Sequence, residues 1–230
     1  HSLDIESYIS SEDDKKIQEL QSSFNFVFIG EFIERKNIQA LLKAFHSEFD
    51  VMEPVNLFIK TSRKDLSYID NYCEQVKSGL KLRKTYKKEI VISGKLSQED
   101  YISVLKQCHV FVMPSRGEGF CIPALESMAL GLPVISTANT GLDDFAYGFK
   151  VESTGSPCFG AVDTLPHLDN ANSQWYEVDH NQLKFAMRSA YMKYVSGEAQ
   201  EDSNQAVKKA KEYDHTLIGE QMKEILNNDN

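Results

Sequence analysis

The stretch HVFVMPSRGEGFCIPALESMALGLPVIST, residues 109–137, decides the fold. Its apolar runs at 109–113 and 132–136 are too continuous for half-exposed strands, so we expect both in a parallel sheet covered on both faces. Between them lie a glycine-rich loop, 114–121, and a short helix predicted over 122–130. The loop therefore follows the carboxyl end of the first strand, which is where ligands bind in open α/β sheets.

Both ends of this predicted helix carry terminus signals. Pro123 suits the first turn, because the N–H that proline lacks would have had no partner there. Gly131 is placed to end the helix in a left-handed cap. The loop thus runs directly into the amino end of a helix, where free N–H groups and the positive end of the dipole favour a phosphate.

Two glutamates flank this helix start. Glu118 lies in the loop and Glu126 on the helix, and the backbone amides between them include those of Phe120, Cys121 and Ile122. A carboxylate on each side of an anion site suits a ligand whose hydroxyls flank a diphosphate, as in a nucleotide sugar. A second interpretation stays open on the residues alone, in which Glu118 is a solvated loop residue and Glu126 merely a good helix former.

The string EGFCIPALESMALGLPVI, residues 118–135, resembles the signature of retaining GT-B glycosyltransferases. This large group 1 family, also called family 4, includes sucrose synthase and bacterial mannosyltransferases. Every fixed position of its signature is present, Gly119 and Phe120 among them. The resemblance implies that Glu118 contacts the donor sugar and that Glu126 holds the ribose.

The resemblance also implies which half of a GT-B enzyme this chain is. It covers roughly residues 24–195 and answers to the C-terminal, donor-binding half. The N-terminal domain, with the acceptor site and the general acid or orienting residues, is expected outside this chain. Because GT-B enzymes react in the cleft between two Rossmann-like halves, this half alone is expected to bind donor and to turn over weakly or not at all.

Glycosyl transfer builds negative charge on the leaving diphosphate, which cations must stabilise in an enzyme without a metal. The family usually supplies an arginine just after the glycine of the first strand and a lysine five residues later. Gly30 and Lys36 match the glycine and the lysine, whereas Glu31 stands in the arginine position and would repel a diphosphate. Arg35 or Lys60 is expected to compensate.

The family resemblance assigns the base of the nucleotide to the segment after the third predicted strand. Gly94 and Lys95 lie there, and family members hold the base mostly through backbone groups. Backbone contacts give no side-chain code for the identity of the base. Arg116, in the loop before Glu118, is either a contact to acceptor or sugar or a solvated loop residue.

Strands alternate with helices along the chain, which predicts an α/β fold with a Rossmann-like, doubly wound parallel sheet, one half of a GT-B fold. Besides the central unit, the predicted strands are 24–30, 55–60, 89–94 and a short piece at 149–152. The predicted helices are 38–49, 65–79, one capped by Ser97, one from Asp179 or Asn181 to about 195, 198–213 and 215–226.

We divide the chain into a linker or partial helix at 1–22, a nucleotide-sugar-binding domain at 23–196 and extra C-terminal helices at 197–230. Residues 155–179 are predicted to be irregular, since no periodicity is visible there. Trp175, within that stretch, is interpreted as an aromatic anchor that pins it to the core, with substrate contact as the alternative.

Composition excludes several classes. The 230 residues carry a formal net charge of −9 and no concentrated basic stripe, so nucleic acid is not an expected partner. The densest basic run, 81–88, is interpreted as a solvated turn, with contact to an acidic lipid surface or to the other domain as the alternative. Four scattered cysteines indicate reduced thiols and a cytoplasmic location, and no apolar run is long enough to span a membrane.

The function expected from sequence is retaining, metal-independent transfer of a sugar from a UDP-, GDP- or other nucleotide-diphosphate donor to a glycan, lipid or protein acceptor. No cofactor or metal is expected beyond that donor substrate. A non-catalytic sugar-nucleotide-binding module of a larger assembly is the alternative, favoured by Glu31. A GT-B epimerase or phosphorylase is a third class, which the complete signature argues against.

Overall fold

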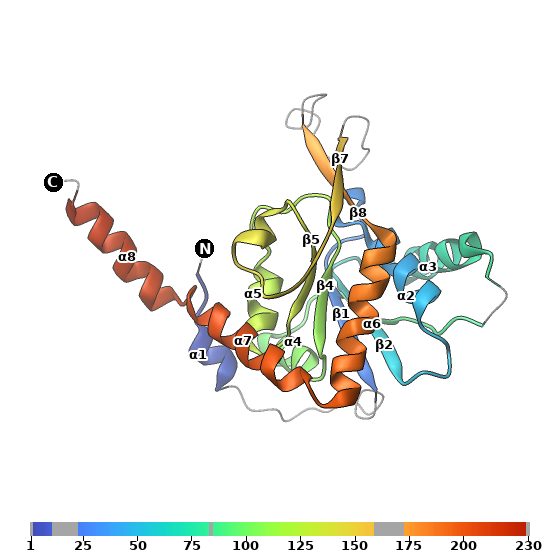
Figure 1. Cartoon of the computed structure of the whole chain (residues 1–230), viewed down its shortest axis with the longest axis horizontal. Helices are drawn as coiled ribbons and strands as arrows, with labels where there is room; N and C mark the ends of the chain where they lie inside the picture. The colour runs from blue at the N-terminus through green and yellow to red at the C-terminus, as the bar shows by residue number, and fades with distance from the viewer. Residues whose placement is uncertain (1, 11–22, 83–84, 159–172, 229–230) are drawn as a thin grey trace.

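The computed structural model describes residues 2–10, 23–82, 85–158 and 173–228. Six parallel strands form its central sheet (Figure 1). They are β1 (Phe24–Ile29), β2 (Val55–Thr61), β3 (Ile90–Ser93), β4 (Val110–Met113), β5 (Val134–Thr137) and β6 (Gly148–Val151). Their order across the sheet is β3-β2-β1-β4-β5-β6, so the predicted doubly wound parallel sheet is confirmed.

Helices cover both faces of this sheet (Figure 1). They are α1 (Ile5–Ile9), α2 (Ile38–Glu48), α3 (Leu66–Leu80), α4 (Gln98–Lys106), α5 (Ile122–Ala129), α6 (His180–Ser196), α7 (Ala199–Lys211) and α8 (His215–Asn228). On one side α2 packs against α3 and α6, and on the other α5 packs against α1 and α7. Two short 3₁₀ turns, η2 (Glu34–Lys36) and η3 (Gly141–Asp144), lie in loops that follow β1 and β5.

Large apolar side chains of the sheet explain why the chain folds this way. β4 is buried along its whole length and β1 is buried at all but its last residue, as expected for strands covered on both faces. The largest fully buried side chains include Phe24, Phe26, Phe28, Phe45, Phe58, Phe111 and Phe145. The central strands are therefore fixed by burial, and the loops at their carboxyl ends start from a rigid base.

The helix-end signals in the central unit work as predicted, and they shift one strand boundary. Gly131 has a φ of +84°, and its N–H donates to the Met128 carbonyl at 2.9 Å. The N–H of Leu132 donates to the Ser127 carbonyl at 3.0 Å, which completes a Schellman cap. Because Leu132 belongs to this cap, β5 begins at Val134 and not at residue 132 as predicted.

The prediction that 155–179 is irregular is wrong for the described part of that stretch. Strands β7 (Ser153–Pro157) and β8 (Gln174–Val178) pair antiparallel in a hairpin that projects from the carboxyl end of the sheet (Figure 1). The predicted segment also includes 159–172, which lie outside the described residues. Helix α6 follows directly, and of its two predicted caps Asp179 is the one used, accepting the Gln182 N–H at 2.8 Å.

The two ends of the described chain lie on the α5 side (Figure 1). Part of the predicted linker is the short helix α1, whose Ile5 and Tyr8 are buried; residues 11–22 lie outside the described part. Helix α7 buries Ala206 and Ala210 completely, whereas α8 projects away from the body of the domain. No helix among the described residues is long and apolar enough to cross a membrane.

Candidate functional site

The candidate site lies where the direction of the sheet order reverses. β1 is flanked by β2 and β4, and the connections that follow β1 and β4 lead to helices on opposite sides of the sheet. This arrangement opens a crevice at the carboxyl ends of the two strands, which is the usual ligand position in open α/β sheets. The predicted residues Gly30, Lys36, Glu118 and Glu126 come from these two connections.

The structure joins three of the predicted residues in one ion-pair cluster. Glu118 Oε1 accepts from Lys36 Nζ at 2.7 Å and from Arg35 Nη1 at 2.9 Å, and its side chain is only 7% exposed. Arg35 also donates to the carbonyl of Gly117 at 2.6 Å. Two cations thus share one buried carboxylate, and the open interpretation of Glu118 as a solvated loop residue is wrong.

Glu126 lines a cavity of about 530 Å³ beside this cluster, together with Gly30, Lys60 and Ser97. The cavity has the size of a small-molecule site. Both carboxylate oxygens of Glu126 accept hydrogen bonds, from Tyr8 at 2.7 Å and Tyr101 at 2.6 Å. Glu126 therefore faces a cavity with an ordered carboxylate.

Gly30 connects the cavity with the cluster. A Cβ there would lie 2.9 Å from the ring of Phe28 and 3.5 Å from Cδ of Lys36. Glycine keeps the space between the end of β1 and the lysine side chain open, as a close approach of ligand to backbone requires. The cavity and the cation pair are consequently neighbours.

The start of α5 was predicted to offer amides to a phosphate. Cys121 is the N-cap residue, and its side chain makes no capping hydrogen bond. Cys121 is buried, and burial together with the nearby Glu118 raises the pKa of its thiol to about 11, so the thiol stays protonated near neutrality. Ile122, by contrast, is exposed at the helix start. Phe120, at the end of the loop, stacks on the buried Phe145 with ring centroids 4.4 Å apart.

A close backbone approach fixes the loop before α5. The N–H of Gly141 donates to the Glu118 carbonyl at 2.9 Å. A Cβ at Gly141 would lie 1.8 Å from the carbonyl oxygen of Gly119, so only glycine allows this contact. Gly119 itself has open space at its own Cβ position. The turn after β5 thus holds the loop that carries Glu118.

Glu31 is turned onto the neighbouring loop. Its carboxylate accepts from the N–H of Ser62 at 3.0 Å and from the hydroxyl of Thr61 at 3.2 Å. Burial would raise its pKa, but these hydrogen bonds outweigh burial and hold the pKa below its ordinary value. Glu31 therefore keeps its negative charge, and its carboxylate accepts hydrogen bonds from the turn that follows β2.

Of the two cations expected to offset Glu31, only Arg35 lies in the Glu118 cluster. The ammonium of Lys60 donates to the carbonyls of Thr61, at 3.1 Å, and Gly94. Burial lowers the pKa of Lys60. Lys60 is one of the residues that line the cavity, and it also holds the turn at Gly94, which has a φ of +83°.

The segment predicted to hold the base lies at the rim of the same cavity. Lys95 is exposed, and the residues that follow it, Leu96, Ser97 and Gln98, line the cavity. Gly94 and Lys95 themselves are not among the lining residues, which begin at Leu96, and their role in holding the base stays a prediction.

Residues of the β7–β8 hairpin hold the loop, and of these contacts the sequence predicted only an anchoring role for Trp175. Arg116 donates to Glu177 at 2.6 Å, and its carbonyl accepts from the N–H of Tyr176 at 2.8 Å. Its guanidinium lies 5.8 Å from the ring centre of Trp175. These contacts hold the Arg116 side chain, which is 20% exposed, against the hairpin, and its contact to acceptor or sugar stays a prediction. Trp175 lies beside the loop. A Cβ atom placed on Gly117 would be 3.9 Å from Cδ1 of Trp175, which is an ordinary van der Waals distance.

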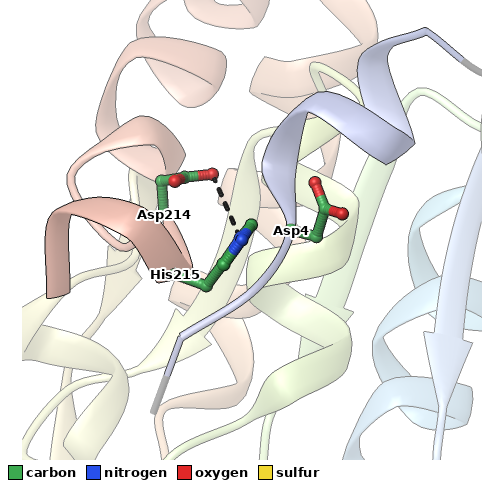
Figure 2. Close-up of side chains that lie close together, drawn as sticks. All are labelled: Asp4, Asp214 and His215. Carbon is green, nitrogen blue, oxygen red and sulfur yellow. Dashed lines mark ion pairs between the residues drawn. The ribbon is translucent and has the colours of Figure 1, made fainter. Parts of the chain in front are cut away.

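One cluster of potential metal ligands appears among the described residues, away from the predicted site. Asp4, Asp214 and His215 offer ligand atoms within 4.8 Å of one another (Figure 2). Both carboxylates already serve the backbone: Asp4 accepts from the N–H of Ser7 at 3.1 Å, and Asp214 accepts from the N–H of Thr216 at 2.9 Å. The cluster is a clasp between the two helices that it caps, α1 and α8.

The chain forms a Rossmann-like domain with a cluster of two cations on one carboxylate and an adjoining cavity. Residues 10–150 match the family described as Glycosyl transferases group 1, and this chain belongs to that family. Its α/β fold is the Rossmann-like fold of a GT-B glycosyltransferase domain.

Similar proteins agree with this assignment. The chain is 29% identical over 141 residues to a serotype-specific mannosyltransferase, WbdA, of Escherichia coli. This match covers 56% of this chain and 16% of WbdA. HepE of Anabaena, solved in complex with UDP-glucose, has a TM-score of 0.66 at 13% identity and covers 99% of this chain and 56% of that protein.

A third similar structure is the C-terminal domain of a group 1 glycosyl transferase from Francisella tularensis. Its TM-score is 0.63 at 17% identity, and the match covers 93% of this chain and 99% of that domain. The chain thus spans about a sixth of the curated mannosyltransferase and about half of HepE, but nearly all of an isolated C-terminal domain.

Proposed function

We propose that this chain is the C-terminal, donor-binding half of a retaining, metal-independent glycosyltransferase that uses a nucleotide-diphosphate sugar. The observation that carries the proposal is the juxtaposition at Gly30 of a cavity of about 530 Å³, lined by Glu126, with the two cations on Glu118. We assign the nucleoside of the donor to the cavity and its diphosphate to the cation pair. The similarity to a C-terminal domain in Francisella tularensis and to a UDP-glucose complex in Anabaena supports the same assignment.

The roles of the residues follow from their positions. The ribose hydroxyls would donate to Glu126, and the base would lie against the backbone after Gly94. The diphosphate would lie near Lys36 and the amides at the start of α5, where the helix dipole favours an anion. Glu118 would then orient the sugar.

The chemical step places charge on the leaving group. The bond between the anomeric carbon and the diphosphate oxygen breaks, and its electron pair leaves with the nucleoside diphosphate. A new bond forms between the acceptor oxygen and the anomeric carbon on the same face, and the acceptor proton is lost to the departing phosphate or to solvent. Lys36 stabilises the leaving diphosphate in this step.

Arg35 is proposed as the second cation, in place of the arginine that Glu31 replaces. Arg35 Nη1 and Lys36 Nζ both donate to Oε1 of Glu118. Glu31 is engaged by Ser62 and Thr61, which removes part of its repulsion. The two cations therefore outnumber the one carboxylate that they share.

The partners of the whole protein follow from this role. An N-terminal GT-B domain would supply the acceptor site, and the acceptor would be a glycan, a lipid or a protein. The proposed location is the cytoplasm, where nucleotide sugars are available, with membrane association for a lipid acceptor.

A non-catalytic sugar-nucleotide-binding module is the second candidate. The observation that favours it is Glu31, a charged carboxylate on the cavity wall where the family places an arginine. Such a module would bind the same nucleotide sugars without breaking the bond between the anomeric carbon and the diphosphate.

A transfer assay on the protein that joins this chain to its N-terminal domain separates the two candidates. We expect release of nucleoside diphosphate from one of UDP-glucose, GDP-mannose and ADP-glucose, unchanged by EDTA, and an α-linked product from the α-linked donor by proton NMR. We expect Glu118→Gln to lower turnover while donor binding persists.

Each result can contradict a separate part of the proposal. Donor binding without turnover would favour the binding module. A β-linked product would refute retention, and loss of activity in EDTA that Mg²⁺ restores would refute metal independence.

A further inference from the structure

The ribose-binding candidate, Glu126, is held by two tyrosines that come from different parts of the chain. Tyr8 Oη donates to Glu126 Oε1 at 2.7 Å, and Tyr101 Oη donates to Oε2 at 2.6 Å. Tyr8 belongs to α1 and Tyr101 to α4, and both line the cavity with Glu126. Short hydrogen bonds to a charged acceptor are among the stronger ones in proteins.

Both hydroxyls remain donors near neutral pH. Burial and the adjacent carboxylate raise the pKa of Tyr8 and of Tyr101 well above the ordinary value for tyrosine. The direction of both hydrogen bonds is therefore fixed, because the ionised carboxylate can only accept. Glu126 cannot rotate without losing one of them.

The two tyrosine hydrogen bonds use only part of the hydrogen-bond accepting capacity of the Glu126 carboxylate. A carboxylate offers about four lone-pair positions, two on each oxygen. Tyr8 uses one on Oε1 and Tyr101 one on Oε2, which leaves each oxygen able to accept one more hydroxyl. A pair of adjacent hydroxyls, one for each oxygen, is the group that suits such a carboxylate.

Tyr8 reaches Glu126 because the segment before α1 is clasped to the joint between α7 and α8. Leu3 exchanges backbone hydrogen bonds with that joint, accepting from His215 at 2.9 Å and donating to Tyr213 at 3.1 Å. Asp214, labelled in Figure 2, accepts from the N–H of Ile5 at 3.2 Å. The position of Tyr8 therefore depends on contacts between the start of the chain and residues 213–215, far away in the sequence.

We propose that Tyr8 and Tyr101 are positioning residues that orient the Glu126 carboxylate toward the vicinal 2′- and 3′-hydroxyls of the donor ribose. They set the preference of the cavity for ribonucleotides over nucleotides that lack these hydroxyls. The inference rests on the proposed function, since it assumes that the cavity holds a nucleoside.

The test compares the affinity of this chain for UDP, GDP and ADP with its affinity for their 2′,3′-dideoxy counterparts by calorimetry. For the base that binds, we expect the wild-type chain to prefer the ribonucleotide by about tenfold or more, since two hydrogen bonds to a charged group are at stake. Tyr8→Phe and Tyr101→Phe should each reduce this preference by roughly three- to tenfold. Binding of the dideoxy nucleotide should remain unchanged.

The preference, rather than the affinity, is the informative quantity. A merely structural role would weaken both nucleotides together and leave their ratio unchanged, which would overturn the inference. Tyr147→Phe is the matched control, because its hydroxyl contacts Asp202 at 3.3 Å, away from Glu126. Should one tyrosine variant fail to fold, the other carries the test, since the two lie on separate helices.

Failure of the proposed function gives a different result. If the wild-type chain bound none of the diphosphates, the proposed function and the inference would both be refuted. If it bound a diphosphate with the ribose preference intact in both variants, only the positioning role of the tyrosines would be refuted.

Discussion

Lys36→Ala is expected to weaken binding of a nucleoside diphosphate by about 10- to 150-fold, the usual worth of a hydrogen bond to a charged group. The side chain of Lys36 is 16% exposed and pairs with Glu118, so a bound diphosphate would share an ammonium that is already ordered. Removing it also leaves the carboxylate with Arg35 as its one described cationic partner. In a protein that joins this chain to the proposed N-terminal domain, the same change should lower turnover, because the leaving diphosphate loses its cation.

Calorimetry with UDP and with uridine distinguishes this loss from general damage. Uridine lacks the diphosphate, and Lys36 does not line the cavity, so uridine should bind both proteins equally. Lys88→Ala removes the same charge from a side chain that is 75% exposed and should bind UDP like the wild type. Undiminished UDP binding by Lys36→Ala would contradict the proposed phosphate role.

Glu89→Ala is expected to give the largest loss of stability, about 3–5 kcal/mol, as is typical when one partner of a buried ionic group is removed. The Glu89 side chain is 3% exposed and pairs with His46 and with Lys77, the latter at 3.2 Å. These contacts join α2 and α3 to the residue before β3. Without the carboxylate, the Lys77 ammonium keeps, among the residues that the structure describes, the exposed partner Glu74 at 2.8 Å.

The same carboxylate predicts a pH dependence. Burial alone would raise the pKa of Glu89, but His46 and Lys77 outweigh it and hold the pKa below its ordinary value of 4.5. The contribution is therefore complete above about pH 4.5, the value of the unfolded chain, and is lost as the pH falls through the lower value of the folded chain. The stability difference between wild type and Glu89→Ala should therefore shrink as the pH falls below about 4.5.

Urea unfolding at pH 7, 5 and 3.5 measures this difference. Glu212→Ala serves as the control, because its pair with Lys209 is exposed and surface pairs contribute at most about 1 kcal/mol. Equal stability of Glu89→Ala and wild type at pH 7 would show that the buried cluster contributes nothing.

The fold could be predicted because the decisive signals are local. Continuous apolar runs such as 110–113 need burial on both faces, and Gly131 ends α5 through its left-handed conformation. The hairpin could not be predicted in the same way. Ser153–Pro157 holds a glycine and a proline and no apolar alternation, and its partner strand β8 also contacts the distant loop, through the bond from the Tyr176 N–H to the Arg116 carbonyl.

The candidate site was predictable as a set of positions and less so as a set of contacts. The motif placed Glu118 at a helix start, but the cluster with Lys36 joins residues 82 positions apart, which no local pattern encodes. The same holds for Tyr8 and Glu126, which are 118 positions apart. Glu31 was expected to repel a diphosphate, and its engagement by Ser62 could not be seen before the loops were brought together.

The most direct test of the central claim is calorimetric titration of this chain with UDP, GDP, ADP and TDP, beside Glu126→Ala. We predict selective binding of one diphosphate, weakened in Glu126→Ala because the ribose loses its acceptor. Binding of that diphosphate with the same affinity by Glu126→Ala would contradict the ribose role. Absence of binding of all four by the wild-type chain would contradict the donor-site account itself.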